Sequence, residues 1–179
     1  SLKDMIAYAR SRPGGANYGA PVSSISQRMW MEVFNQQMGI KMTFVGYKTA
    51  TAAVQALRAG DIQFMNVGLP AIGPLAAAGQ ARLIALGAQK RSTTTPDVPT
   101  VEEGGGPRGF VSDSWVGYVT HAGVPAAIVN RLNRAILAAA RQPNVRQFYA
   151  ENDYTIMDLT PTEFAALIRS EEHTSELQS

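Results

Sequence analysis

The sequence contains no cysteine, which excludes disulfide bonds, thiolate metal sites and a cysteine nucleophile. It also has no apolar run near the roughly 20 residues that a membrane-spanning helix needs. The opening stretch SLKDMIAYAR predicts a helix and not a secretory signal. Lys and Arg are scattered, and the net charge is only +2. The sequence therefore indicates neither a membrane-spanning protein nor a partner for nucleic acid.

Hydrophobic residues make up 45% of the 179 residues and charged residues 17%, which is typical of a globular chain. Short apolar strands alternate with helical patterns, and this order predicts an α/β fold with a mostly parallel sheet. The expected strands are 17–20, 41–47, 62–68, 82–88 and 114–122, with a further extended stretch at 153–159. The expected helices are 1–12, 24–37, 51–59, 70–78, 125–141, 144–150 and one that starts after Thr160.

Two features mark the middle and the end of the chain. Residues 89–109 are rich in Pro, Thr and Gly without any period, which predicts a long surface loop and a domain boundary near 100–113. Near the C-terminus, Thr160 and Glu163 have the spacing of a capping box, with Pro161 in the first helical turn.

The stretch NYGAPVSSISQR combines a strand, a turn with three serines and a helix start. Such a turn could hold a nucleophile, cradle a phosphate or receive a carboxylate, because the first N–H groups of a helix have no intrahelical partner and its dipole favours an anion. Two more turns follow expected strands, and ligands of open parallel sheets bind at the carboxyl ends of strands. The candidate ligand-binding residues are Ala20, Pro21, Val22, Ser23, Ser24, Ser26, Tyr47, Lys48, Thr49 and Asn66.

Motifs for other chemistry are missing from the sequence. There is no nucleophile elbow, no phosphate-binding loop and no spaced cluster of metal-binding acids. His121 is expected to be a turn residue, and the other histidine, His173, lies near the C-terminus. We therefore expect no catalytic residue, no metal and no cofactor.

Three stretches in fixed order resemble one family, the extracytoplasmic solute receptors of tripartite tricarboxylate transporters, also called Bug-type proteins. They are SLKDMIAYARSRPGGANYGAP, the long run from FVGYKTATAAVQAL to KRSTTTPDVPTVEEGG, and SWVGYVTHAGVPAAIVNRLNRAI. The resemblance implies a type II periplasmic-binding-protein fold, in which two lobes close on a small carboxylate. It implies that 1–113 is nearly all of the second lobe and 114–168 an incomplete part of the first.

The same resemblance implies the setting in which the protein works. The ligand would be a dicarboxylate or tricarboxylate, an acidic amino acid or an aromatic acid. The receptor would be periplasmic and monomeric, with an integral-membrane permease as partner and a signal peptide on a missing N-terminal part.

The sequence departs from the family pattern at two places. Val22 and Ser24 stand where the family turn usually has glycines, and Arg28 stands where a histidine is common. Residues 169–179 (RSEEHTSELQS) do not resemble the family and look like translated sequencing adapter, hence a non-native tail.

Two alternatives from other classes remain open at this point. One is the effector-binding domain of a cytoplasmic transcription regulator, which shares this fold. The other is an α/β hydrolase that uses Ser23 or Ser24.

Overall fold

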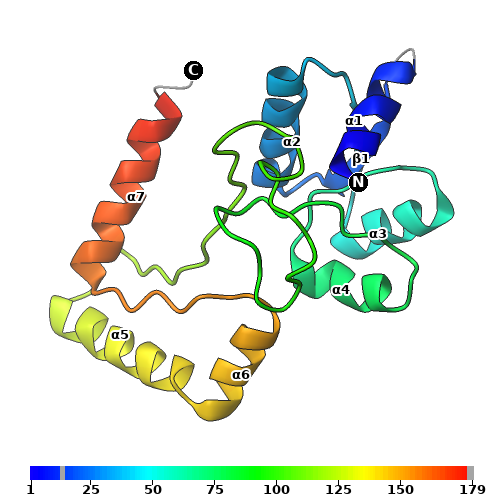
Figure 1. Cartoon of the computed structure of the whole chain (residues 1–179). Coiled ribbons are helices and arrows are strands. Elements are labelled where there is room, and N and C mark those ends of the chain that lie inside the picture. Colours follow the sequence, from blue (N-terminus) through cyan, green and yellow to red (C-terminus); the bar gives the residue numbers. More distant parts are fainter. Residues whose placement is uncertain (13–14, 177–179) are drawn as a thin grey trace. The chain divides into compact units, whose positions relative to one another are not determined.

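A computed structural model describes the backbone of residues 1–12 and 15–176 and the side chains of these residues up to Ser170. Pro13 and Gly14, which follow the helix expected at 1–12, lie outside the described residues. The chain forms two compact units, Ser1–Trp115 and Val116–Ser179 (Figure 1).

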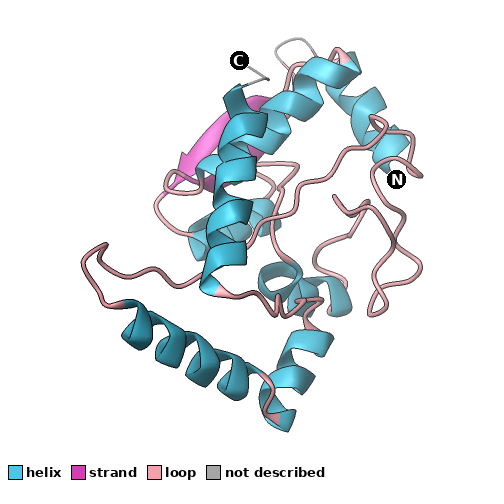
Figure 2. Ribbon diagram, turned by 90° about the vertical axis from the view of Figure 1, so that its left-hand side faces the viewer, coloured by secondary structure: helices cyan, strands magenta, loops and turns pink. Residues whose placement is uncertain are grey.

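The sheet of the first unit contains two parallel strands, β1 (Asn17–Pro21) and β2 (Thr43–Tyr47), among the described residues (Figure 2). Their register places Pro21 opposite Tyr47, so both strands end at the same edge. On the other side of β1, Phe64 forms an isolated parallel bridge with Tyr18. The order across the sheet is therefore β2, β1 and then the chain around Phe64.

Four helices accompany this sheet: α1 (Leu2–Ser11), α2 (Ile25–Met38), α3 (Ala50–Ala59) and α4 (Leu69–Ala77). Ser1 caps α1, and Asp4 completes a capping box. Helices α2 and α3 end at Gly39 and Gly60, which adopt the left-handed conformation that glycine permits.

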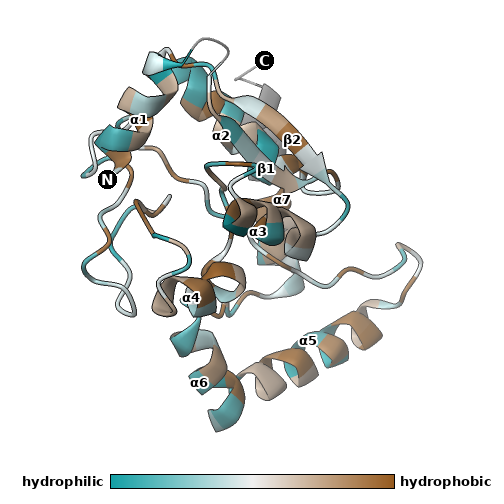
Figure 3. Ribbon diagram, turned by 90° about the vertical axis from the view of Figure 1, so that its right-hand side faces the viewer, coloured by the Kyte–Doolittle hydropathy of each residue, from teal (hydrophilic) through white to brown (hydrophobic). Residues whose placement is uncertain are grey.

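The core lies between one face of the strands and helices α1 and α2. Tyr18 is completely buried there, among apolar side chains that include Leu2, Ile6, Met31 and Phe34. The helix α3 packs against β1 and β2 (Figure 3). On the side of the sheet that faces α3, Gly19 has no side chain, so the Ile62 and Tyr47 side chains can approach the backbone of β1. This packing fixes the positions at which α2 and α3 begin.

The strand expected at 62–68 is wrong, since only Phe64 pairs with β1. The reason lies in the donors of β1 on this side. The Asn17 N–H bonds the Gln63 side chain (3.0 Å), and the Gly19 N–H bonds the Phe64 carbonyl (3.0 Å). The next residue with that orientation is Pro21, which has no N–H, so the ladder ends there.

The other expected strands also fall short. Residues 82–88 form a single bridge, between Leu86 and Thr100, and 114–122 and 153–159 form no strand in the described chain. Extended chain becomes a strand only where a neighbour pairs with its backbone groups, and here such neighbours are absent from the described residues. The seven expected helices are all present, with bounds shifted by a few residues.

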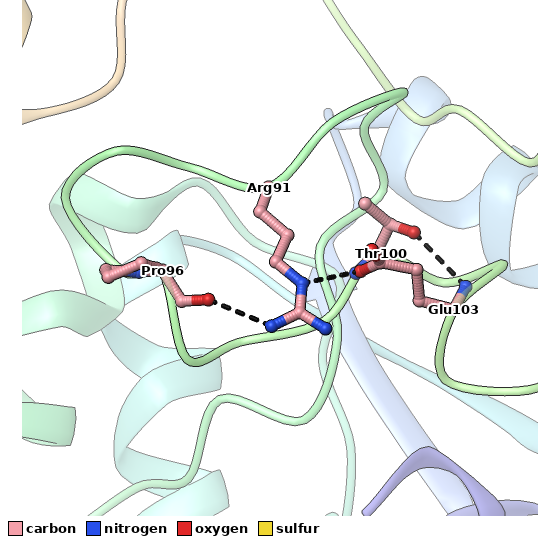
Figure 4. Close-up of polar contacts among 4 residues, drawn as sticks. All are labelled: Arg91, Pro96, Thr100 and Glu103. Atoms are coloured by element: carbon pink, nitrogen blue, oxygen red, sulfur yellow. Dashed lines mark hydrogen bonds and ion pairs between the residues drawn. The ribbon is translucent and has the colours of Figure 1, made fainter.

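The loop 89–109 is held by a small polar network (Figure 4). The Arg91 guanidinium donates to the Glu103 carboxylate (2.7 Å) and to the Pro96 carbonyl (3.1 Å). The Thr100 N–H also donates to Glu103 (2.9 Å), and the Glu103 N–H donates back to the Thr100 hydroxyl (3.2 Å). The bond from Thr100 and the nearby Arg91 charge lower the pKa of Glu103. The loop is therefore ordered by its own polar residues.

The second unit contains α5 (Ala126–Ala140), α6 (Pro143–Glu151) and α7 (Pro161–Glu176). The Asn133 side chain donates to the Leu159 carbonyl (3.0 Å), and the Phe164 ring lies against the backbone at Gly117. No described side chain of this unit, 116–170, is buried. The unit thus has no core of its own within that range.

The capping box expected at the start of α7 is confirmed and predicts a pH dependence. The Glu163 carboxylate accepts from the Thr160 hydroxyl (2.7 Å) and N–H (2.8 Å), and these bonds lower the pKa of Glu163 below its ordinary 4.5. A lowered carboxyl pKa stabilises the helix start above pH 4.5, and this effect is lost as the pH falls through the folded pKa. We expect NMR to show fraying of the first turn of α7 below pH 4.5. Glu163→Gln should abolish this pH dependence. The role of Glu163 would be contradicted if the first turn of α7 still frayed below pH 4.5 in that variant.

Candidate functional site

Two of the three predicted turns meet at one edge of the sheet. β1 and β2 end opposite each other at Pro21 and Tyr47, and the Val22 N–H donates to the Tyr47 carbonyl (2.9 Å). The third turn, with Asn66, follows Phe64, whose bridge to Tyr18 is parallel to β1. The chain after Phe64 therefore runs toward the same edge, where α2, α3 and α4 all begin.

The turn after β1 leaves a set of donors free at the start of α2. Ser24 is the N-cap, but its side chain makes no capping hydrogen bond. Within the described chain, nothing accepts from the N–H groups of Ile25, Ser26 and Gln27. The exposed hydroxyls of Ser23 and Ser26 lie in the same turn. Ala20 and Pro21, by contrast, are buried and serve as the base of the turn. This is the positive end of a 14-residue helix, a place that favours an anion.

The turn after β2 differs because its hydroxyl is already in use. The Thr49 side chain accepts from the Ala52 N–H (3.1 Å) and so caps α3. Lys48 is exposed and has no carboxylate partner among the described residues. The Tyr47 ring approaches Gly19, so it packs on the sheet beside the turn. This turn therefore offers a cation and the free N–H groups of α3.

The third turn contributes the fewest polar groups. Asn66 is half-buried, and no hydrogen bond of its side chain to another described residue is found. The N-cap of α4 is Gly68, which has extended backbone and no side chain to cap the helix. Pro70 in the first turn has no N–H, so α4 presents fewer donors than α2.

Val22 and Ser24 fit the turn without strain. Asp153 is the only non-glycine residue with a positive φ in the described chain, and Ser24 has a φ of −93°. The turn is thus built without the conformation that glycine alone adopts readily. Val22 takes up space above Gly46, where any Cβ would lie 2.6 Å from a Val22 methyl. A side chain at position 46 would therefore have to displace the Val22 methyl.

Arg28 is directed toward the core side of the turn. Its guanidinium lies 4.8 Å from the centre of the Phe44 ring, a cation–π contact. Nearby, the Tyr18 hydroxyl donates to the Glu32 carboxylate (2.7 Å). The pKa of Tyr18 is raised, mainly because the side chain is buried and secondly because of the bond to Glu32 and its charge. These contacts attach α2 to the sheet one turn after the free donors.

Sequence reasoning missed Gln27. Ser24 and Gln27 have the spacing of a capping box, a signal that was available in the sequence. The box does not form, because the Ser24 N–H bonds the Pro21 carbonyl (2.9 Å). The Gln27 Oε1 atom is buried and has no hydrogen-bond partner in the described part of the chain.

A hollow of about 680 Å³ lies elsewhere in the first unit. Its lining includes Gln89, Thr100, Glu102, Glu103 and Phe110, and none of the predicted ligand-binding residues. Two carboxylates in the wall disfavour an anionic ligand, so we place the candidate site at the strand edge. Within the described residues there is no group of acids and histidines suited to a metal, and no helix is long and apolar enough to cross a bilayer.

His121 has a local role, as expected. Its Nδ1 atom accepts from the Gly123 N–H (3.1 Å) in the turn before α5.

Comparison with protein families gives a match to the tripartite tricarboxylate transporter family receptor over residues 1–176. The chain belongs to this receptor family. Members of the family and its solved structures are solute-binding receptors and not enzymes, so the hydrolase alternative has no support.

Relatives of this receptor chain are found among sequences and structures. A UPF0065 protein of Cupriavidus necator is 34% identical over 154 residues, which are 86% of this chain and 46% of that protein. BugT of Bordetella pertussis is 28% identical over 171 residues, 96% of this chain and 52% of BugT. The chain thus spans about half the length of the curated relatives it matches.

Solved structures confirm the fold class. R. palustris Rpa4515 with adipate superposes with a TM-score of 0.90 at 28% identity and covers 98% of this chain and 58% of its own. MatC from Rhodopseudomonas palustris with bound malate has a TM-score of 0.72 at 25% identity, covering 84% and 51%.

Proposed function

We propose that this chain is part of a solute receptor that captures a small carboxylate and presents it to a membrane permease. The observation that carries the proposal is the set of unpaired N–H groups at the start of α2, beside the turn of Lys48 and Thr49. Two structurally similar receptors were solved with adipate and with malate, both dicarboxylates. These ligands support a small dicarboxylate as the cargo, beside the tricarboxylates, acidic amino acids and aromatic acids that the resemblance also implies.

The expected affinity is consistent with these donors. A hydrogen bond to a charged group contributes about 1.5–3 kcal/mol net. Three such bonds approach the roughly 8 kcal/mol of micromolar binding. Ser23, Ser24 and Ser26 can add hydroxyl donors, and Lys48 adds a positive charge across the turn.

The arrangement of lobes is part of the proposal. Residues 1–113 form the second ligand-binding lobe, and 114–168 form part of the first. Closure of two lobes around the anion would then give the closed state its stability. The receptor acts in the periplasm as a monomer, with a permease as its partner. The non-native origin of 169–179 stays a prediction, and the family match, which extends to residue 176, includes most of this segment.

A pair of alanine variants separates binding from stability. The Ser24 side chain caps nothing in the structure, so Ser24→Ala should weaken adipate binding about tenfold, or about 1.4 kcal/mol, with little change in stability. Thr49→Ala removes a formed cap and should lower the free energy of unfolding by about 1 kcal/mol. Calorimetry and urea unfolding of the longer receptor encoded by the gene would measure both.

The outcomes of this experiment are distinct. Unchanged adipate affinity in Ser24→Ala, with Thr49→Ala destabilised, would show that the serine turn is not the site. Failure of the receptor to bind adipate, malate, glutamate and benzoate alike would contradict carboxylate capture itself. The 179-residue chain alone should bind adipate more weakly than the longer receptor, because one lobe is incomplete.

A further inference from the structure

Two apolar side chains stand among the polar groups of the candidate site. Val22 is 65% exposed and Ile25 is 77% exposed. Both belong to the first unit, as do the turns after β1 and β2, so their arrangement does not involve the second unit. Single exposed apolar residues are common on protein surfaces. The position of these two side chains, more than their exposure, therefore indicates what they do.

Val22 joins the turn after β1 to the turn after β2. Its N–H donates to the Tyr47 carbonyl (2.9 Å), a bond that holds the ends of the two strands side by side. One of its methyl groups lies over the backbone of Gly46, 2.6 Å from the place that a Cβ would take. Lys48 and the start of α3 follow directly along the chain. The Val22 side chain thus separates the free N–H groups of α2 from the polar groups of the Lys48 turn.

Ile25 stands at the α2 end of the same path. It is the first residue of the helix, and its N–H is one of the donors that nothing accepts from within the described chain. A carboxylate held by these donors therefore lies beside an apolar side chain, and the atoms that follow it toward Lys48 meet the Val22 methyl groups.

We propose that Val22 determines which acids the site takes, and that it favours a dicarboxylate whose middle is an unsubstituted aliphatic chain or an aromatic ring. This inference rests on the proposed function, because it takes the two turns as the places where the carboxylates bind. A ligand that reaches from α2 to the Lys48 turn passes over Val22. A hydroxyl or amino group on its middle would lose water there and find methyl groups in place of hydrogen-bond partners.

A matched pair of acids tests this preference. Galactarate has the same carbon chain as adipate and carries a hydroxyl on each carbon between the carboxylates. Calorimetry of the longer receptor encoded by the gene should show adipate binding at least about tenfold more tightly than galactarate. Equal affinities, or tighter binding of galactarate, would overturn this inference and leave carboxylate capture intact. Failure of both acids, and of malate, glutamate and benzoate, would contradict carboxylate capture and this inference with it.

A pair of threonine variants assigns the preference to Val22. Val22→Thr keeps the branched shape and adds a hydroxyl, so the ratio of the two affinities should fall below about threefold. The unfolding transition in urea should change little, because this side chain is exposed. Val33→Thr is the control, since Val33 lies on α2 about 12 Å along the axis from Ile25. It should keep the full preference for adipate. An unchanged ratio in Val22→Thr, or the same fall in both variants, would show that Val22 does not set the preference.

Discussion

Replacing Gly15 with alanine is expected to lower the free energy of unfolding of the first unit by about 3–5 kcal/mol. Gly15 has a φ of +79°, and a Cβ at this position would lie 1.5 Å from the carbonyl oxygen of Lys41. Backbone cannot rotate away as a flexible side chain can, so Gly15 and the chain before β2 must separate. Because the Ala16 carbonyl accepts from the Thr43 N–H (2.8 Å), that separation breaks the start of the sheet. Urea unfolding followed by circular dichroism would measure the loss.

Gly39→Ala provides the matched control. Gly39 also has a positive φ, +59°, but no heavy atom lies within 4 Å of a Cβ built there. Gly39→Ala should lower the free energy of unfolding by only about 1 kcal/mol, because alanine is strained in the left-handed conformation. Equal losses in the two variants would show that the contact with Lys41 contributes nothing.

Asn35→Ala is expected to have the next largest effect, about 2–4 kcal/mol. The buried Asn35 side chain donates to the Met42 carbonyl (3.1 Å) and accepts from the Met42 N–H (3.2 Å). Removing it leaves a buried donor and a buried acceptor without partners. It also frees the end of α2 from the chain that enters β2. Thermal and urea unfolding would both report this change.

The control for Asn35 lies on the same helix. Gln36 is exposed, so Gln36→Ala should change stability by less than about 0.5 kcal/mol. A loss in Asn35→Ala no larger than that of the control would contradict the role of this buried pair.

Local signals in the sequence were enough to predict the helices. Thr160 and Glu163 have the spacing of a capping box in the sequence and form one in the structure. Gly39 and Gly60 end helices in the left-handed conformation. These devices involve residues only three or four apart, so sequence alone reveals them.

The strands were predicted less well because pairing is not local. An apolar run such as 62–68 is compatible with a strand, but its ladder depends on the donors of β1, and Pro21 offers none. The runs at 114–122 and 153–159 form no strand within the described chain.

The sequence predicted that the turns after the strands meet at one sheet edge, but not which of their polar groups are already bonded. The parallel register of β1 and β2 brings the Ser24 and Thr49 turns to one edge, as the strand–helix alternation implies. Whether a hydroxyl in these turns is free or already bonded depends on backbone geometry, which the spacing of residues in the sequence does not reveal. Thr49 caps its helix and Ser24 does not, although both are hydroxyl N-caps. Whether these residues hold a ligand remains a prediction.

The missing N–H of Pro21 has a consequence for how such receptors diversify. Since the ladder with β1 stops at Phe64, the chain from Met65 to Val67 borders the proposed pocket without taking part in the sheet. If the proposed pocket holds the ligand, we expect mutations there to alter ligand preference while the scaffold keeps its hydrogen bonds. A lineage could thereby shift between acids through a few changes in one short stretch, with no loss of foldability.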